Sequence, residues 1–198
     1  MTPTDALDVS GHLQIYKIYK DGTEEKVFDD HNLITSGMGL GLSMLFAGQG
    51  SSIEDFQIRY FQVGTGAATT NNPDYKTFKL ATPIPNTTAG KAQYGFVPNS
   101  SHPRMNPNGG GASNELFILI PDNAIKKSSP TSVTYVLYLT EQAVMTTDIN
   151  EIGLFMNNPL STLLGDQSKI SPLVAYKEFT SITKTEQYSL VFKWKLSF

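Results

Sequence analysis

The chain has 198 residues, a formal net charge of −3 and no cysteine, and 39% of its residues are hydrophobic. This composition excludes a disulfide framework, a thiolate nucleophile and a cysteine-based zinc site, and its aromatic content argues against disorder. The charge balance gives no electrostatic reason to expect nucleic acid or an anionic membrane as a partner, and no apolar run approaches the ~20 residues that cross a bilayer. Because the first residues lack the layout of a secretion signal, we expect one soluble domain over residues 1–198, made inside a cell.

The start of the chain predicts a β-hairpin. Residues 13–19 are rich in aliphatic and aromatic side chains, the turn dipeptide Asp21-Gly22 follows, and residues 26–28 resume the strand pattern. Residues 29–31 are polar and predict a turn between this hairpin and the next element.

The next segment predicts a helix over residues 36–46. Thr35 or Ser36 can cap its N-terminus, and Gly48 can end it. The apolar residues that share one stripe or its edge are Met38, Leu42, Leu45 and Phe46. Three glycines weaken a helix by about 1 kcal/mol each relative to alanine, but they would let another element pack closely. These glycines are Gly37, Gly39 and Gly41.

Further strands are predicted over residues 53–63, 115–120, 132–140, 149–156 and 172–179. In the first of them, one alternating set of side chains faces each side of the strand: Phe56, Ile58 and Tyr60 against Gln57, Arg59 and Phe61. Gly64-Thr65-Gly66 ends that strand and predicts a tight turn with positive φ. Residues 67–113 are dominated by Pro, Asn, Thr, Ser and Gly, which predicts a long loop region.

The C-terminal segment has the clearest pattern in the sequence. Its apolar residues lie at strict period two: Tyr188, Leu190, Phe192, Trp194, Leu196 and Phe198. The residues between them are mostly polar, which predicts an antiparallel strand with one deeply buried face and one wet face. With seven or more short strands and one helix, the chain is expected to be mainly β: an antiparallel, jelly-roll-like β-sandwich with one short helix and long loops.

Several apolar residues recur on the strand faces opposite the main apolar face: Tyr16, Tyr19, Phe61, Tyr138 and Val191. An apolar excess spread over several strands favours contact with another subunit. The alternative is that the aromatic side chains form a platform for a sugar ring.

No pattern names a catalytic, cofactor-binding or metal-binding residue. The three histidines, His12, His31 and His102, lack partners at metal-ligand spacing. The glycine clusters at residues 37–41 and 64–66 fit neither phosphate-binding fingerprint, and no serine lies in G-x-S-x-G. The carboxylate pairs are sequence neighbours, so they do not imply the facing geometry of a glycoside hydrolase. A Ser-His-Asp triad is a spatial arrangement, and the sequence leaves it open.

The order of several short motifs resembles that of small virion proteins of tailed bacteriophages. In those proteins an N-L-I/V-T-x-x-G segment and a short helix precede a V-G-T/S-G turn, and an E-I/A-G-L-F segment precedes a closing strand with K-T and a tryptophan. The matching residues here include Asn32, Gly37, Gly64, Thr65, Gly66, Glu151, Gly153, Phe155, Lys184 and Thr185. The match covers most of the chain outside residues 67–148 and rests on the order and spacing of the motifs.

This resemblance implies an accessory structural part of the phage particle, in the tail, neck, baseplate or fibre base or as capsid decoration, with no catalytic residues to transfer. It implies a place in the virion after assembly in the host bacterial cytoplasm, where a cysteine-free chain suits reducing conditions. The aromatic content suits obligate interfaces. We therefore expect a homotrimer that also docks on other virion proteins, without a cofactor, nucleic acid or membrane.

Two other classes of function stay open. A glycan-binding module for host recognition would use the sandwich and loop aromatics such as Tyr75, Tyr94 and Phe96, and saturable sugar binding would identify it. A hydrolase of the cell envelope has no nameable pair of catalytic groups, and turnover of peptidoglycan or polysaccharide would reveal it.

Overall fold

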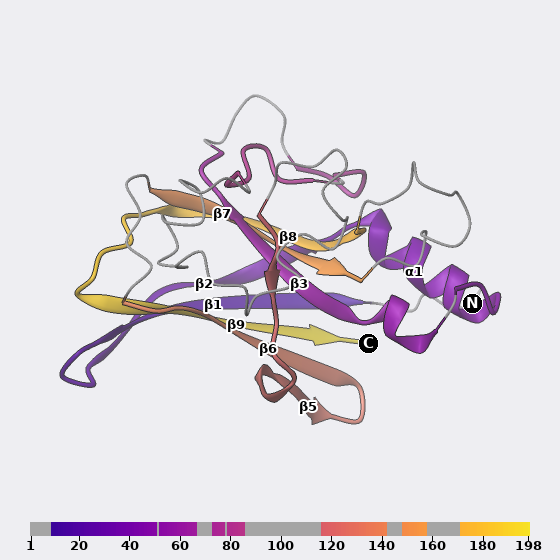
Figure 1. Ribbon diagram of the computed structural model, residues 1–198, viewed down its shortest axis with the longest axis horizontal. Helices are drawn as coiled ribbons and strands as arrows, with labels where there is room; N and C mark the ends of the chain where they lie inside the picture. The colour runs from indigo at the N-terminus through magenta and orange to yellow at the C-terminus, as the bar shows by residue number, and fades with distance from the viewer. Residues whose placement is uncertain are drawn as a thin grey trace, which may run out of the picture.

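The computed structural model (Figure 1) describes residues 9–50, 52–66, 73–77, 79–85, 116–141, 148–157 and 171–198. Within them lie nine strands: β1 (Ser10–Tyr19), β2 (Glu24–Ile34), β3 (Ile58–Gly64), β4 (Ile118–Leu119), β5 (Ile125–Ser129), β6 (Ser132–Leu139), β7 (Ile149–Met156), β8 (Leu173–Ile182) and β9 (Tyr188–Ser197). The same residues include the helix α1 (Ser36–Phe46) and two short 3-10 helices, η1 (Ile53–Phe56) and η2 (Asp122–Ala124). None of these described helices is long and apolar enough to span a membrane.

The strands form one curled antiparallel sheet in the order β4-β3-β7-β8-β2-β1-β9-β6-β5. Strand β2 belongs to both halves of this sheet, because most of it pairs with β1 whereas Leu33 and Ile34 at its end pair with β8. The two halves share one hydrophobic core, in which the ring centroids of Phe179 in β8 and Phe192 in β9 lie 6.5 Å apart. The predicted class, mainly β and antiparallel with one helix, is confirmed, and the arrangement is compatible with a sandwich.

Strand β9 lies between β1 and β6 and forms the centre of the core. Trp194 pairs with Leu13 on one side and Tyr135 on the other, and its side chain is fully buried. The five alternate apolar residues from 188 to 196 are all buried, as the period-two pattern predicts. Phe198 is the exception: it follows the end of β9 and is 40% exposed, so its predicted place in the sealed core is wrong.

The predicted apolar face on the other side of the strands is present around β9, where Tyr16, Val191 and Tyr138 lie side by side, but Phe61 and Tyr19 do not belong to it. Phe61 joins the main core, because a bulge in β3 interrupts the alternation of side chains. Val191 is buried, with Tyr16 and Tyr138 opposite it on the neighbouring strands. Tyr19 is half-buried and packs against the core. Of the five residues, only Tyr138 is largely exposed, at 54%.

Three predicted boundaries differ from the structure. Residues 53–56 form η1 and not the start of a strand, because Ser52 and Asp55 make a reciprocal capping box that begins a helical turn. Within residues 116–120, the described part of the strand predicted over 115–120, only Ile118–Leu119 forms a strand. Residues 29–31 lie within β2 and not in a turn, since β2 stays in register with β1 as far as Asn32.

Helix α1 has the predicted bounds and packs closely on β8. Gly48 has a φ of +65°, as a glycine that ends a helix often does. A Cβ on Gly37 would lie 2.0 Å from the carbonyl oxygen of Leu173, so only glycine allows this approach. The hydroxyl of Thr35 does not cap the helix but donates to the same carbonyl. Both residues therefore seat the start of α1 against the sheet.

Candidate assembly interface

Glu151, in β7, holds two neighbouring segments against the sheet. Its side chain is fully buried, and its oxygens accept hydrogen bonds from the backbone N–H groups of Gly66 at 3.2 Å, Ala81 at 2.9 Å and Thr82 at 2.8 Å. The hydroxyl of Tyr176 in β8 donates a fourth hydrogen bond at 2.8 Å. Burial and the nearby Glu151 carboxyl raise the pKa of Tyr176 far above its usual value, so the hydroxyl stays a donor at neutral pH.

This carboxyl group also accounts for the glycines of the V-G-T-G motif. A Cβ on Gly64 would lie 2.3 Å from Glu151 Oε1, and one on Gly66 would lie 2.6 Å from the same oxygen. Between them, the Thr65 N–H donates to the Thr82 carbonyl at 3.0 Å. The prediction of positive φ for this turn is wrong, because the glycines need close approach instead. The described glycines with positive φ are Gly22, Gly48 and Gly50.

Two more motif residues, Asn32 and Trp194, meet although 162 positions separate them. The Trp194 indole Nε1–H donates to Asn32 Oδ1 at 2.7 Å, so its single donor is satisfied within the core. The Asn32 amide lies so close to β1 that a Cβ on Gly11 would be 2.1 Å from its oxygen. The first and last motifs of the sequence are thus joined by one contact.

Phe155 belongs to a second, smaller hydrophobic cluster, and Gly153 lies beside two of its members. The ring of Phe155 meets that of Phe117 edge-on, with 5.0 Å between centroids. A Cβ on Gly153 would lie 2.6 Å from a methyl of Leu173 and 2.7 Å from one of Leu80. Gly153 therefore allows these side chains to close over β7.

Lys184 is a fully buried lysine at the beginning of the link to β9. Its ammonium group donates to the Thr185 carbonyl at 2.6 Å and lies 5.4 Å from the centre of the Tyr188 ring. Burial lowers the pKa of Lys184 to about 8, against the opposing effect of Glu141. The ten motif residues thus contact the core, the loops beside it or one another.

The Lys184 environment predicts that stability increases with pH. Its pKa in the folded chain, about 8, lies below the value of 10.5 expected when unfolded, so the unfolded chain binds more protons between these values. We expect the free energy of unfolding to rise by about 1–2 kcal/mol from about pH 8 to about pH 9.5. Urea unfolding of the wild type and of Lys184→Met across this pH range measures the rise. It should be absent in the variant, and an equal increase of the free energy of unfolding with pH in both proteins would contradict the role of Lys184.

The histidines form no metal-binding cluster in the described part of the chain. The rings of His12 and His31 lie 5.1 Å apart on paired strands, and His12 contacts the carboxylate of Asp29. No set of three or more His, Cys, Asp or Glu among the described residues could hold a metal ion. His102 lies outside the described residues, as do the glycan-binding candidates Tyr94 and Phe96.

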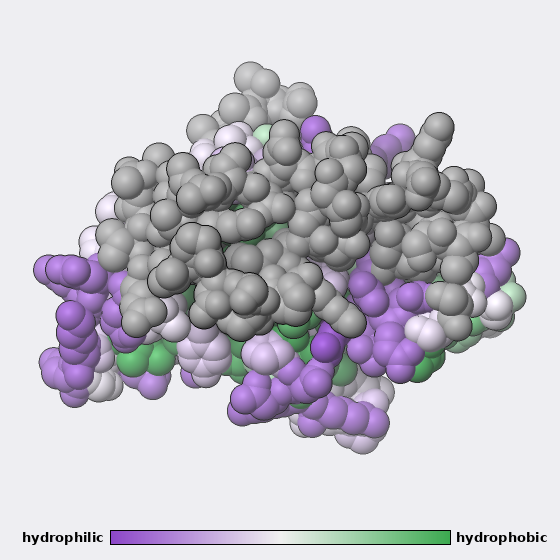
Figure 2. Space-filling view, viewed as in Figure 1, coloured by the Kyte–Doolittle hydropathy of each residue, from purple (hydrophilic) through white to green (hydrophobic). Residues whose placement is uncertain are grey.

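The apolar end of the molecule, formed by α1, η1 and Tyr75, is the strongest candidate for a contact with another protein. Helix α1 contains no charged residue, and Leu40 and Phe46 on it are 40% and 79% exposed. Ile53 of η1 is 61% exposed, and Tyr75, whose carbonyl accepts the Ser36 N–H at 2.8 Å, is 59% exposed. In Figure 2, white and green atoms lie beside hydrophilic ones at the end where Figure 1 places α1. Exposed apolar groups that gather in this way mark interaction surfaces more often than scattered ones do.

Sequence reasoning placed this contact elsewhere, on the strand faces. It assigned Phe46 to the buried stripe of α1, whereas the buried residues of the helix are Met38, Gly41 and Met44. A Cβ on Gly41 would lie 2.3 Å from Met156, so the glycine side of the helix packs on the sheet and part of the apolar side faces outward. The available signal was an eleven-residue helix without any charge, which is unusual for a solvated surface.

Comparison with family models, curated proteins and solved structures found no match to this chain.

Proposed function

We propose that the protein is a non-enzymatic structural component of a bacteriophage particle, which self-associates and docks on other virion proteins through its apolar end. The observation that carries this proposal is the charge-free helix α1, with Leu40 and Phe46 exposed beside Ile53. Desolvating such a surface costs little, because no charged group on the helix has to lose its water. A partner that covers it gains the hydrophobic free energy of each buried side chain.

The roles of the motif residues support a structural part. Glu151 anchors two segments, Asn32 satisfies the indole of Trp194, and Gly37 seats the helix. These contacts fix the packing of the fold. Among the motif residues, only the buried Lys184 has a reactive side chain. A rigid scaffold with an apolar end fits assembly in the host cytoplasm and a place in the virion. As the oligomer we propose a homotrimer, since cyclic arrangements are the usual outcome for identical subunits.

Replacing Phe46 with glutamate tests this proposal. Burying an unpaired carboxylate in an interface costs several kcal/mol, so we expect self-association to weaken by at least about 100-fold. Light scattering coupled to size-exclusion chromatography should show three chains for the wild type and one for Phe46→Glu, with unchanged circular dichroism.

Tyr138→Glu is the matched control, because Tyr138 is also an exposed aromatic residue but lies on β6. This variant should remain a trimer. A monomeric wild type, or dissociation by Tyr138→Glu and not by Phe46→Glu, would contradict an interface at the apolar end.

A glycan-binding module is the second candidate, favoured by the outer face around β9. Tyr138 is exposed there, and the ring of Tyr16 lies beneath the Lys193 ammonium, with 4.3 Å from Nζ to the ring centroid. The Tyr16 hydroxyl donates to Gln14 at 3.1 Å, which adds polar groups next to the aromatic ones. Saturable binding on a glycan array that is lost in Tyr138→Ala would establish this function. Binding that survives the substitution would place the sugar site elsewhere.

A further inference from the structure

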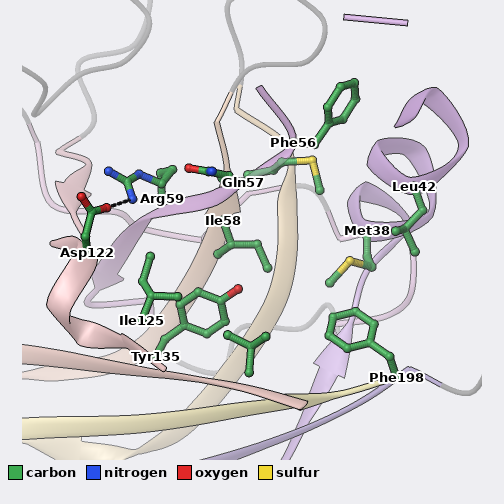
Figure 3. A pocket seen from close by; sticks show the side chains of 12 residues that line it. Met38, Leu42, Phe56, Gln57, Ile58, Arg59, Asp122, Ile125, Tyr135 and Phe198 are labelled. Atoms are coloured by element: carbon green, nitrogen blue, oxygen red, sulfur yellow. Dashed lines mark hydrogen bonds and ion pairs between the residues drawn. The ribbon is translucent and has the colours of Figure 1, made fainter. Parts of the chain in front are cut away.

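A cavity of about 450 Å³ opens between the two halves of the sheet, next to α1 (Figure 3). Its walls come from α1, η1, β3, η2, β5, β6, β7 and the end of the chain, and most of its lining side chains are apolar. This volume falls within the range of pockets that hold small molecules, about 300–1,000 Å³. The cavity therefore has the size and the walls of a ligand site.

Tyr135 contributes the polar group that a specific site needs. It lies on β6, is only 6% exposed, and points its hydroxyl into the space between Ile58 and the remaining walls (Figure 3). No residue in the described part of the chain forms a hydrogen bond with that hydroxyl, and burial raises the pKa of Tyr135 to about 12. The residue is buried, but its hydroxyl oxygen is not among the fully buried unpartnered atoms of the described residues, so a molecule in the cavity can reach it and accept its hydrogen bond.

The charged groups at the cavity wall are already paired. Arg59 forms an ion pair with Asp122, and Figure 3 shows the guanidinium directed toward Asp122 and away from the tyrosine. The side chains of the other lining residues carry no charge. An ion next to Tyr135 would therefore lose part of its hydration without gaining an unpaired side-chain counter-charge, which favours neutral ligands over charged ones.

We propose that this cavity binds a small, neutral, mainly apolar molecule that accepts a hydrogen bond from the Tyr135 hydroxyl. The apolar walls supply most of the binding free energy, and the tyrosine selects ligands with a carbonyl or ether oxygen at the matching position. This site is independent of the proposed assembly role, because its occupation can be measured whether the protein is a trimer or a monomer.

Two methionine methyl groups provide the readout. Met38 and Met156 line the cavity, whereas Met44, which is also buried in α1, does not. In full-length protein with ¹³C-methyl methionine, acetophenone should shift the signals of Met38 and Met156 in a saturable way and leave Met44 unchanged. Ethylbenzene, which has the same shape without the oxygen, should bind about 3- to 10-fold more weakly.

Tyr135→Phe separates specific binding from simple partition into an apolar space. It removes only the hydroxyl, which has no partner in the described part of the chain, and should make the affinities of the two probes equal. Tyr138→Phe on the same strand is the control and should keep the preference for acetophenone. The proposal is overturned if neither probe shifts Met38 and Met156, or if the preference persists in Tyr135→Phe.

Discussion

Replacing Glu151 with alanine is expected to lower the free energy of unfolding by about 4 kcal/mol, a large part of the stability of a domain this size. The substitution leaves the N–H groups of Gly66, Ala81 and Thr82 without their acceptor, whereas the Tyr176 hydroxyl keeps Glu178 as an acceptor. Each buried donor that loses its partner costs about 1–3 kcal/mol, and part of this cost is recovered where water enters. Urea unfolding followed by circular dichroism measures the change.

Glu178→Ala is the matched control for this prediction. Glu178 accepts a hydrogen bond from the same tyrosine, at 2.9 Å, but it is only half-buried and, among the described residues, bonds no loop backbone. We expect a loss below about 1 kcal/mol for it. Equal effects of the two substitutions would contradict the role of Glu151 as the anchor of these segments.

Trp194→Ala should cost a similar amount, about 4 kcal/mol, because it removes the largest fully buried side chain of the core. The smaller change Trp194→Phe keeps an aromatic ring but leaves Asn32 without its donor, and we expect about 2 kcal/mol. Since Trp194 is the only tryptophan, unfolding has to be followed by circular dichroism and not by its fluorescence.

Lys195→Ala, one position further along β9, should change stability by less than about 0.5 kcal/mol because Lys195 is exposed. A loss of less than about 1 kcal/mol in Trp194→Ala would show that β9 is not the centre of the core. Combining Trp194→Phe with Asn32→Ala should cost less than the sum of the two single changes, since both break the same hydrogen bond.

Local patterns explain which parts of the fold could be predicted. The alternation along residues 188–196 and the bounds of α1 follow from side chains that are close in sequence, and both are present in the structure. The bulge in β3 adds one residue to the strand, and the capping box before η1 begins one helical turn. Composition alone does not predict either change in the backbone. Their effects were the misplacement of Phe61 and an overlong strand.

The site was harder to predict than the fold, because it depends on contacts between distant segments. The sequence placed Glu151 and Gly64 in separate motifs, and only the folded chain brings the carboxyl to the glycine. The outward position of Phe46 follows from which side of α1 meets Met156, and periodicity does not determine that choice. Tyr135 lies on the inward face of β6, but nothing local in the sequence indicates that its hydroxyl meets a cavity.

The way in which β2 passes from one half of the sheet to the other has a mechanical consequence. Only Leu33 and Ile34 pair with β8, so two residue pairs provide the ladder at this junction. Apart from these pairs, the Thr35 N–H to Val174 carbonyl bond and the Lys177–Asp30 ion pair, cohesion between the halves rests on contacts among hydrophobic side chains, which weaken in the cold. Under a shearing force, we therefore expect the two halves of the sheet to yield first at β2.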